Sequence, residues 1–144
     1  APVDDELGLT AARRAVSVEG TLPDLSDAVI VQLDRTATIA EGRVPWGLLP
    51  LLPPDRTGIR AASTASVSDL AGTGAGPIIV SGRSLHHLPG ATRLIEELSE
   101  SRDVVVLEMG TPSEWRPRKA SAFVTTHGAS RANSRAAAEL LGVL

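Results

Sequence analysis

The C-terminal stretch of the sequence constrains the fold most. The run 122–126, Ala-Phe-Val-Thr-Thr, is followed by His127 and Gly128 and then by an alanine-rich segment that ends at Gly142. β-branched and aromatic residues favour strands, whereas alanine and leucine favour helices. Polar residues crowd the start of the alanine-rich segment, where a helix has free backbone N–H groups that need acceptors. The stretch therefore predicts a strand, a tight turn and a helix, which form one βα unit of an α/β protein.

The rest of the chain adds similar units. Continuous apolar runs predict strands that are buried on both faces, at 28–33, 78–81 and 103–109. Apolar residues at helical spacing predict helices over 6–16 and from about 90 to 101. Strands separated by helices or long crossovers pair in parallel with right-handed connections. The expected fold is a three-layer, doubly wound, Rossmann-like α/β domain with a mostly parallel sheet of about five or six strands.

Composition narrows the class of protein further. The chain has 144 residues, which suits one domain over 1–144 and is too short for a (β/α)₈ barrel of ~250 residues. Only 2% of the residues are aromatic, so the core must be aliphatic. The net charge of -3 provides no basic field for a nucleic acid backbone. Cysteine is absent, which excludes disulfides and cysteine-ligated zinc. No uncharged run is long enough to span a membrane. We expect a soluble domain, cytoplasmic or secreted according to what precedes it.

The ligand edge of such a sheet lies at the carboxyl ends of its strands. Arg83 and His86 follow one predicted strand, and His127 follows another, so a parallel sheet places all three on one rim. Ser130 and Arg131 open the last predicted helix, where free N–H groups can hold an anion, although Ser130 also suits a helix cap. These five residues are the candidates for contact with a ligand.

Catalytic and cofactor sites have little support. Glu108 ends a predicted strand and is the one catalytic candidate, but a structural carboxylate is the simpler interpretation. His86 and His87 are adjacent, which is poor geometry for one metal ion, so no metal site is expected. The glycine-rich run 72–76 precedes a strand instead of following one, so it is no dinucleotide fingerprint and no cofactor is expected.

A long segment from 34 to 54, interrupted by prolines, is expected to contact a partner. It carries a large aromatic residue and several leucines in a chain with few aromatic residues, a combination typical of partner surfaces: Trp46, Leu48, Leu49 and Leu51. The alternative is that these side chains cover an edge of the sheet.

Several motifs, in order along the chain, resemble one protein family. They are the segment 11–20, the loop 39–48, the strand and Arg-x-x-His of 78–87, the strand and Gly-x-Pro turn of 104–112, and the Thr-x-Gly-x-Ser turn of 126–130 with its alanine-rich helix before Leu141-Gly142. Together they are similar to the C-terminal domain of glycoside hydrolase family 3, in particular of actinobacterial β-N-acetylhexosaminidases.

The resemblance implies a role as well as a fold. Members carry their nucleophilic Asp on an N-terminal catalytic barrel, and the hexosaminidase branch keeps its acid/base loop there too, but this chain has no Lys-His-x-x-Gly-His-Gly pattern. It is therefore expected to be the C-terminal fragment of a larger two-domain glycosidase of β-N-acetylhexosaminidase or β-glucosidase type. It would pack on that barrel, shape its active-site rim near the carbohydrate substrate and be inactive alone. Two alternatives stay open: a freestanding Rossmann-like module that binds a small anion at Ser130, and a small hydrolase that uses Glu108.

Overall fold

The computed structural model describes residues 2–35, 46–111 and 113–144. Its strands form one six-stranded sheet in the order β1-β6-β5-β4-β2-β3. The strands are β1 (Ser17–Gly20), β2 (Val29–Asp34), β3 (Gly58–Ala62), β4 (Ile78–Gly82), β5 (Val104–Glu108) and β6 (Ala122–Thr125). Every neighbouring pair is parallel except β1 and β6. The predicted α/β class with a mostly parallel sheet is confirmed.

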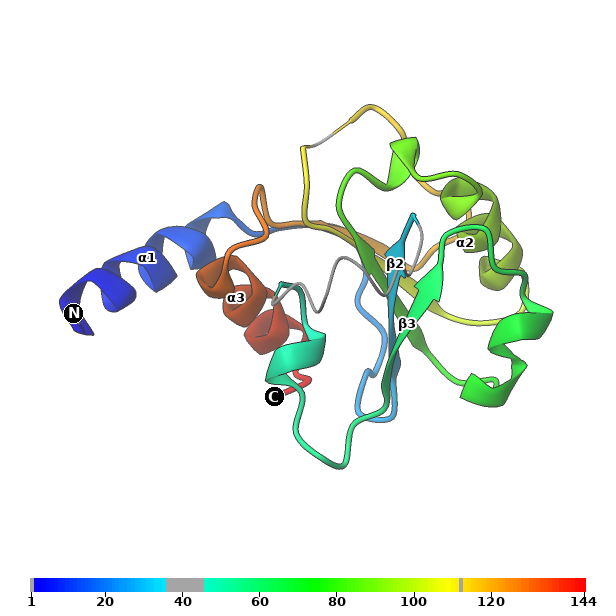
Figure 1. The fold of residues 1–144 in the computed structure, drawn as a ribbon, viewed down its shortest axis with the longest axis horizontal. Coiled ribbons are helices and arrows are strands. Elements are labelled where there is room, and N and C mark those ends of the chain that lie inside the picture. The colour runs from blue at the N-terminus through cyan, green and yellow to red at the C-terminus, as the bar shows by residue number, and fades with distance from the viewer. Residues whose placement is uncertain (1, 36–45, 112) are drawn as a thin grey trace.

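Helices cover both faces of the sheet. The α-helices are α1 (Pro2–Ala15), α2 (Ala91–Ser99) and α3 (Arg131–Leu141), and the short 3₁₀ helices are η2 (Leu49–Leu51), η3 (Ser68–Thr73) and η4 (Leu85–His87). Figure 1 shows α2 and α3 on opposite sides of the sheet, which is the predicted three-layer arrangement. Helix α1 packs on α3 and continues beyond the body of the domain.

The core is aliphatic and lies in two parts, one on each face of the sheet. Successive residues of a strand point to opposite faces, so in β4 Ile79 packs in the cluster that contains α3 while Ile78 and Val80 pack in the cluster that contains α2. Strands β4, β5 and β6 are buried along their whole length. Burial on both faces explains why these strands are continuous apolar runs in the sequence.

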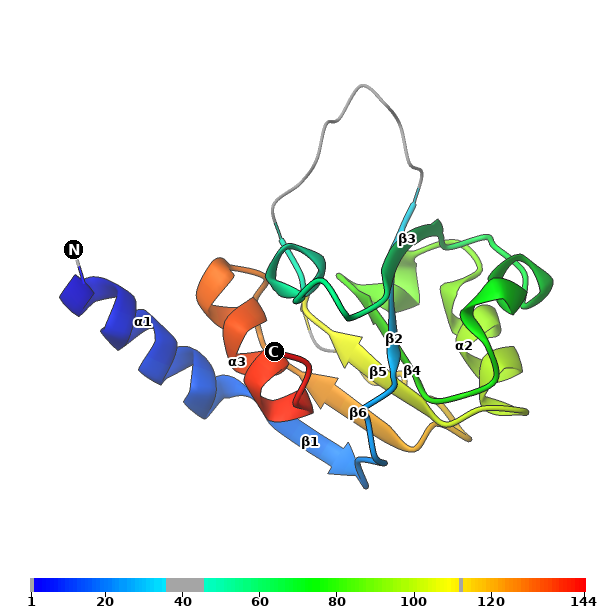
Figure 2. The same cartoon turned by 90° about the horizontal axis from the view of Figure 1, so that it is seen from below.

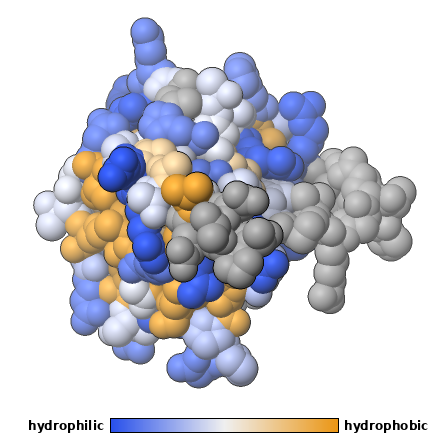
Figure 3. Space-filling view, turned by 90° about the vertical axis from the view of Figure 1, so that its left-hand side faces the viewer, coloured by the Kyte–Doolittle hydropathy of each residue, from blue (hydrophilic) through white to orange (hydrophobic). Residues whose placement is uncertain are grey.

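The edge of the sheet that carries β1 is exposed to solvent, in contrast to the buried central strands. All four residues of β1 are exposed. Arg13 of α1 donates to both carboxylate oxygens of Glu139 of α3, at 2.9 and 3.0 Å, and this hydrogen-bonded pairing lowers the pKa of Glu139. The exposed large apolar side chains of the described residues lie on α1, on β1, in the last turn of α3 and after that helix: Leu7, Val18, Leu140 and Leu144. Figure 3 looks at the α1 end and shows apolar areas between polar ones.

Candidate functional site

Buried polar side chains gather toward the carboxyl ends of the strands. Those of the described residues lie within the last three residues of a strand, directly after one, or in the first turn of α3: Gln32, Ser63, Ser81, Glu108, Thr125, Thr126 and Ser134. Buried polar groups cost free energy unless they are paired. Their concentration at one edge of an otherwise aliphatic core marks this edge, shown near the top of Figure 2, as the candidate site.

Glu108 is fixed by backbone groups. It is 2% exposed, and one carboxylate oxygen accepts the Ser84 N–H at 2.7 Å and the Gly110 N–H at 2.8 Å. The other oxygen accepts the Leu85 N–H at 2.9 Å. The carboxylate thus holds together the turns that follow β4 and β5. A side chain with both oxygens engaged in this way is a structural support of the rim.

Local backbone geometry makes this support possible. Ser84 has φ 53°, in the left-handed region that non-glycine residues rarely adopt. A Cβ at Gly110 would lie 2.6 Å from the Ser84 nitrogen, so only glycine fits there. Sequence reasoning favoured a structural carboxylate at Glu108 but could not name these partners, because the donors are main-chain groups. The one signal in the sequence is the glycine that follows Glu108 and Met109.

Arg83 and Trp46 form one unit at the same edge. The central guanidinium carbon of Arg83 lies 4.3 Å from the centre of the Trp46 ring. Trp46 is 5% exposed, whereas Arg83 is exposed to solvent. A guanidinium over an indole face is a cation–π contact. The charged side chain therefore covers the tryptophan and closes the core at this end.

The predicted common rim follows from the strand order. Both β4 and β6 pair in parallel with β5, so the loops with Arg83 and with His127 open at the same edge, one strand apart. His86 lies in η4, its ring centre 3.9 Å from that of His87, while His127 is exposed with φ 58°. Within the described part of the chain, no hydrogen bond or ring contact joins Arg83, His86 and His127 directly.

The start of α3 is capped by its own side chains. Ser130 Oγ accepts the Asn133 N–H at 3.2 Å, and Asn133 Oδ1 accepts the Ser130 N–H at 3.1 Å. This reciprocal pair is a capping box. Arg131 is exposed next to it. Because the helix supplies its own acceptor at this turn, the structure adds no support for an anion held by the Ser130 end.

The expected contact segment needs correction. Residues 36–45, with most of the loop 39–48, lie outside the described residues. Trp46 and Leu48 are 5% and 0% exposed and belong to the core on the α3 side, so neither presents a surface to a partner. Leu49 and Leu51, in η2, are half-buried against the same core. This geometry fits better with the alternative, in which these side chains cover an edge of the sheet. Burying large apolar side chains contributes the most free energy of folding per residue.

Sequence reasoning also missed a buried polar contact beside Trp46. Gly47 donates its N–H to Ser134 Oγ of α3 at 3.1 Å, and a Cβ at Gly47 would lie 2.3 Å from Gln32 Oε1. Gly47 has φ 86°, in the left-handed region that favours glycine. Three buried atoms of described residues have no hydrogen-bond partner, and all lie near this edge: Gln32 Oε1, Ser63 Oγ and His86 Nδ1. Buried polar atoms without a hydrogen-bond partner are rare in native proteins, and ordered water commonly satisfies them.

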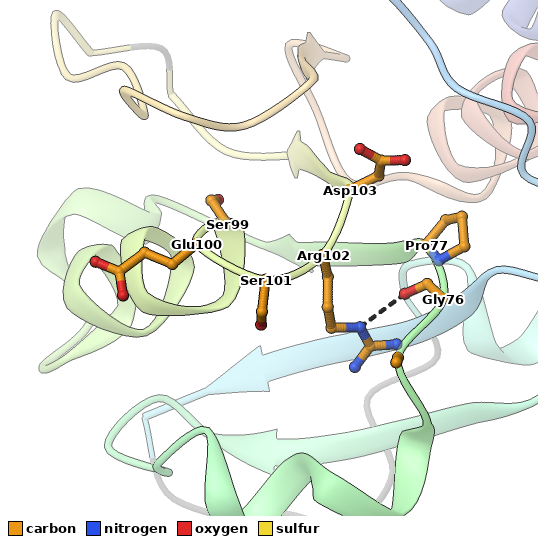
Figure 4. A pocket seen from close by; sticks show the side chains of 8 residues that line it. Gly76, Pro77, Ser99, Glu100, Ser101, Arg102 and Asp103 are labelled. Atoms are coloured by element: carbon orange, nitrogen blue, oxygen red, sulfur yellow. Dashed lines mark hydrogen bonds between the residues drawn. The ribbon is translucent and has the colours of Figure 1, made fainter.

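A hollow at the opposite edge does not have the features of a binding site. It has a volume of about 430 Å³ and is lined by the segments that enter β4 and β5. Figure 4 shows that its polar side chains diverge: Glu100 points away, while Arg102 turns toward Gly76 and donates to its carbonyl oxygen at 2.7 Å. Arg102 also donates to Thr73 Oγ1 at 2.7 Å, so it ties two loops together.

Among the described residues, no group of His, Cys, Asp and Glu could hold a metal ion. In the same ranges, no helix is long and apolar enough to cross a membrane.

Comparison with known proteins gives a likeness in fold. No protein-family model matches the chain, and no curated protein matches its sequence. Among solved structures, the chain is similar to a glycoside hydrolase family 3 β-N-acetylglucosaminidase from Paenibacillus sp. str. FPU-7, with a TM-score of 0.64 and 15% sequence identity. The superposition covers 94% of this chain and 30% of that chain. The described chain thus has the fold of one part of a family 3 glycoside hydrolase.

Proposed function

We propose that this chain is the accessory C-terminal domain of a family 3 glycoside hydrolase of β-N-acetylhexosaminidase or β-glucosidase type. In this proposal it packs on the catalytic barrel of the same polypeptide and shapes the rim of the active site. The likeness in fold over 94% of the chain, matched to only 30% of the neighbour, is the observation that carries the proposal. The motifs that resemble the family occur in order along the chain and add to it.

The carboxylates at the carboxyl edge support a role without catalysis. Retaining glycosidases need two carboxyl groups about 5–5.5 Å apart, one of which attacks while the other donates a proton. Among the described strands, β2 ends in Asp34 and β5 in Glu108. Asp34 Oδ2 accepts from Arg60 at 2.7 and 2.9 Å, and Glu108 accepts three backbone N–H groups. These contacts favour a structural role for both side chains.

The isolated chain is therefore expected to show no hydrolysis of 4-nitrophenyl N-acetyl-β-glucosaminide or 4-nitrophenyl β-glucoside above the buffer rate. Release of nitrophenol from the purified chain measures this directly. The matched variant is Glu108→Gln, assayed at a temperature where circular dichroism shows it folded. Turnover by the unmodified chain that disappears in the folded variant would contradict the proposal and favour a small hydrolase that uses Glu108.

A further inference from the structure

Arg83 is held in a fixed position at the carboxyl edge. The Gly82 carbonyl on one side of it accepts the Met109 N–H at 2.8 Å. The Ser84 N–H on its other side donates to Glu108 at 2.7 Å. Both neighbours of Arg83 are thus tied to β5 or to the turn that follows it. A functional side chain supported by such contacts is preorganised, because its backbone loses little freedom when a ligand binds.

The side chain of Arg83 also has a defined place, over the ring of Trp46. Its guanidinium lies 4.3 Å from the centre of the Trp46 ring, and within the described ranges it makes no hydrogen bond or ion pair. Stacking leaves the N–H groups in the plane of the guanidinium free. Most arginines with a structural role in this chain do use their N–H groups, as Arg56 does on the carbonyl oxygens of Leu25 and Gly142. Arg83 therefore retains donors that no group of the described residues uses.

Those donors have a definite chemical preference. The planar fork of a guanidinium matches the two oxygens of a carboxylate or phosphate, and such charge-assisted pairs are stronger than neutral hydrogen bonds. Both strands next to β4 end in a carboxylate that already has partners. Glu108 is buried and accepts from three backbone N–H groups, and Asp34 pairs with Arg60. The hydroxyl groups of a neutral sugar could also accept hydrogen bonds from Arg83, but they would neither pair with its charge nor match the two parallel donors of the guanidinium.

We infer that Arg83 binds the carboxylate or phosphate group of an acidic sugar at the carboxyl edge of the sheet, and that Glu108 is its positioning residue. The place of this sugar at the rim of an active site rests on the proposed function. The contact between Arg83 and the anion does not, because it needs only the domain itself.

Titration of the chain with glucuronate, glucose 6-phosphate and glucose tests the inference. The Nε–H resonance of Arg83 and the fluorescence of Trp46, the latter in a Trp115→Phe background, both report on the contact. We expect at least one acidic sugar to bind about tenfold or more tightly than glucose, the value of one charge-assisted hydrogen bond. Binding of glucuronate would identify the anion as a carboxylate, and binding of glucose 6-phosphate would identify it as a phosphate. Inorganic phosphate should compete with the acidic sugar that binds.

Two variants make the result specific. Arg83→Met keeps an apolar side chain over Trp46 but removes the charge, and it should bind the acidic sugar no better than glucose. Arg93→Met removes a positive charge from the solvent face of α2, where Arg93 pairs with Glu97. It should leave the preference for the acidic sugar over glucose unchanged. The inference is overturned if glucose binds as well as both acidic sugars, or if Arg83→Met keeps the preference. The titration uses only this domain, so its result does not depend on whether the larger polypeptide is an active glycosidase. The binding of an acidic sugar and the proposed accessory function can therefore fail separately.

Discussion

Replacing Trp46 with alanine is expected to lower the free energy of unfolding by about 3–5 kcal/mol, the range for a large aromatic side chain removed from a core. Trp46 is 5% exposed and packs in the core cluster on the α3 side with Leu48 and Met109. Its loss would also leave Arg83 without the ring that it covers. Domains of this size have only about 5–15 kcal/mol of stability, so the variant should melt far below the unmodified chain.

Urea denaturation followed by circular dichroism measures this effect, and Trp115→Ala is the matched control. Trp115 is half-buried, packs at the margin of the other core cluster and meets Phe123 edge to face at 6.1 Å between ring centres. Its removal should cost clearly less than that of Trp46. A Trp46→Ala variant as stable as the unmodified chain would show that Trp46 is not a core residue and would return it to the partner surface.

Glu108→Ala is expected to be the second most damaging change, at about 3 kcal/mol or more, because hydrogen bonds to a charged acceptor contribute about 1.5–3 kcal/mol each and three donors lose their acceptor together. The donors are the backbone N–H groups of Ser84, Leu85 and Gly110. Glu108→Gln should cost less, since its amide keeps one oxygen. The NH₂ group of the glutamine would face a backbone N–H that it cannot accept from, so part of the stability would still be lost.

The control for this prediction is Glu114→Gln. Glu114 is exposed in the connection between β5 and β6, and a surface change of this kind is usually within about 0.5 kcal/mol of neutral. Amide hydrogen exchange at Ser84 and Leu85 adds a local readout, since their protection should fall in both Glu108 variants. Unchanged protection together with unchanged stability would mean that Glu108 does not hold the rim.

The sheet could be predicted from the sequence because its central strands are buried on both faces. Their continuous apolar runs and the long crossovers between them leave few other arrangements. The common edge of the Arg83 and His127 loops followed from parallel pairing alone. The antiparallel pairing of β1 with β6 could not be predicted, because the four exposed residues of β1 carry no burial pattern.

The details of the candidate site were harder to predict for a physical reason. The partners of Glu108 are main-chain N–H groups, which every residue except proline possesses, so no side-chain pattern announces them. The contact of Arg83 with Trp46 joins segments far apart in the sequence, and it decides that Trp46 is covered by its own domain. A tryptophan in a proline-rich loop has the composition of a partner surface whether or not the fold covers it, and only the tertiary packing distinguishes the two cases.

The role as an accessory domain is tested by the activity of the polypeptide encoded by the complete reading frame, compared with the same polypeptide lacking residues 1–144. We expect the frame to encode a (β/α)₈ barrel of ~250 residues ahead of this domain. We also expect the complete polypeptide to hydrolyse 4-nitrophenyl N-acetyl-β-glucosaminide or 4-nitrophenyl β-glucoside, and removal of this domain to lower kcat/KM sharply. A reading frame without a barrel, or a barrel that works equally well after the deletion, would contradict the account.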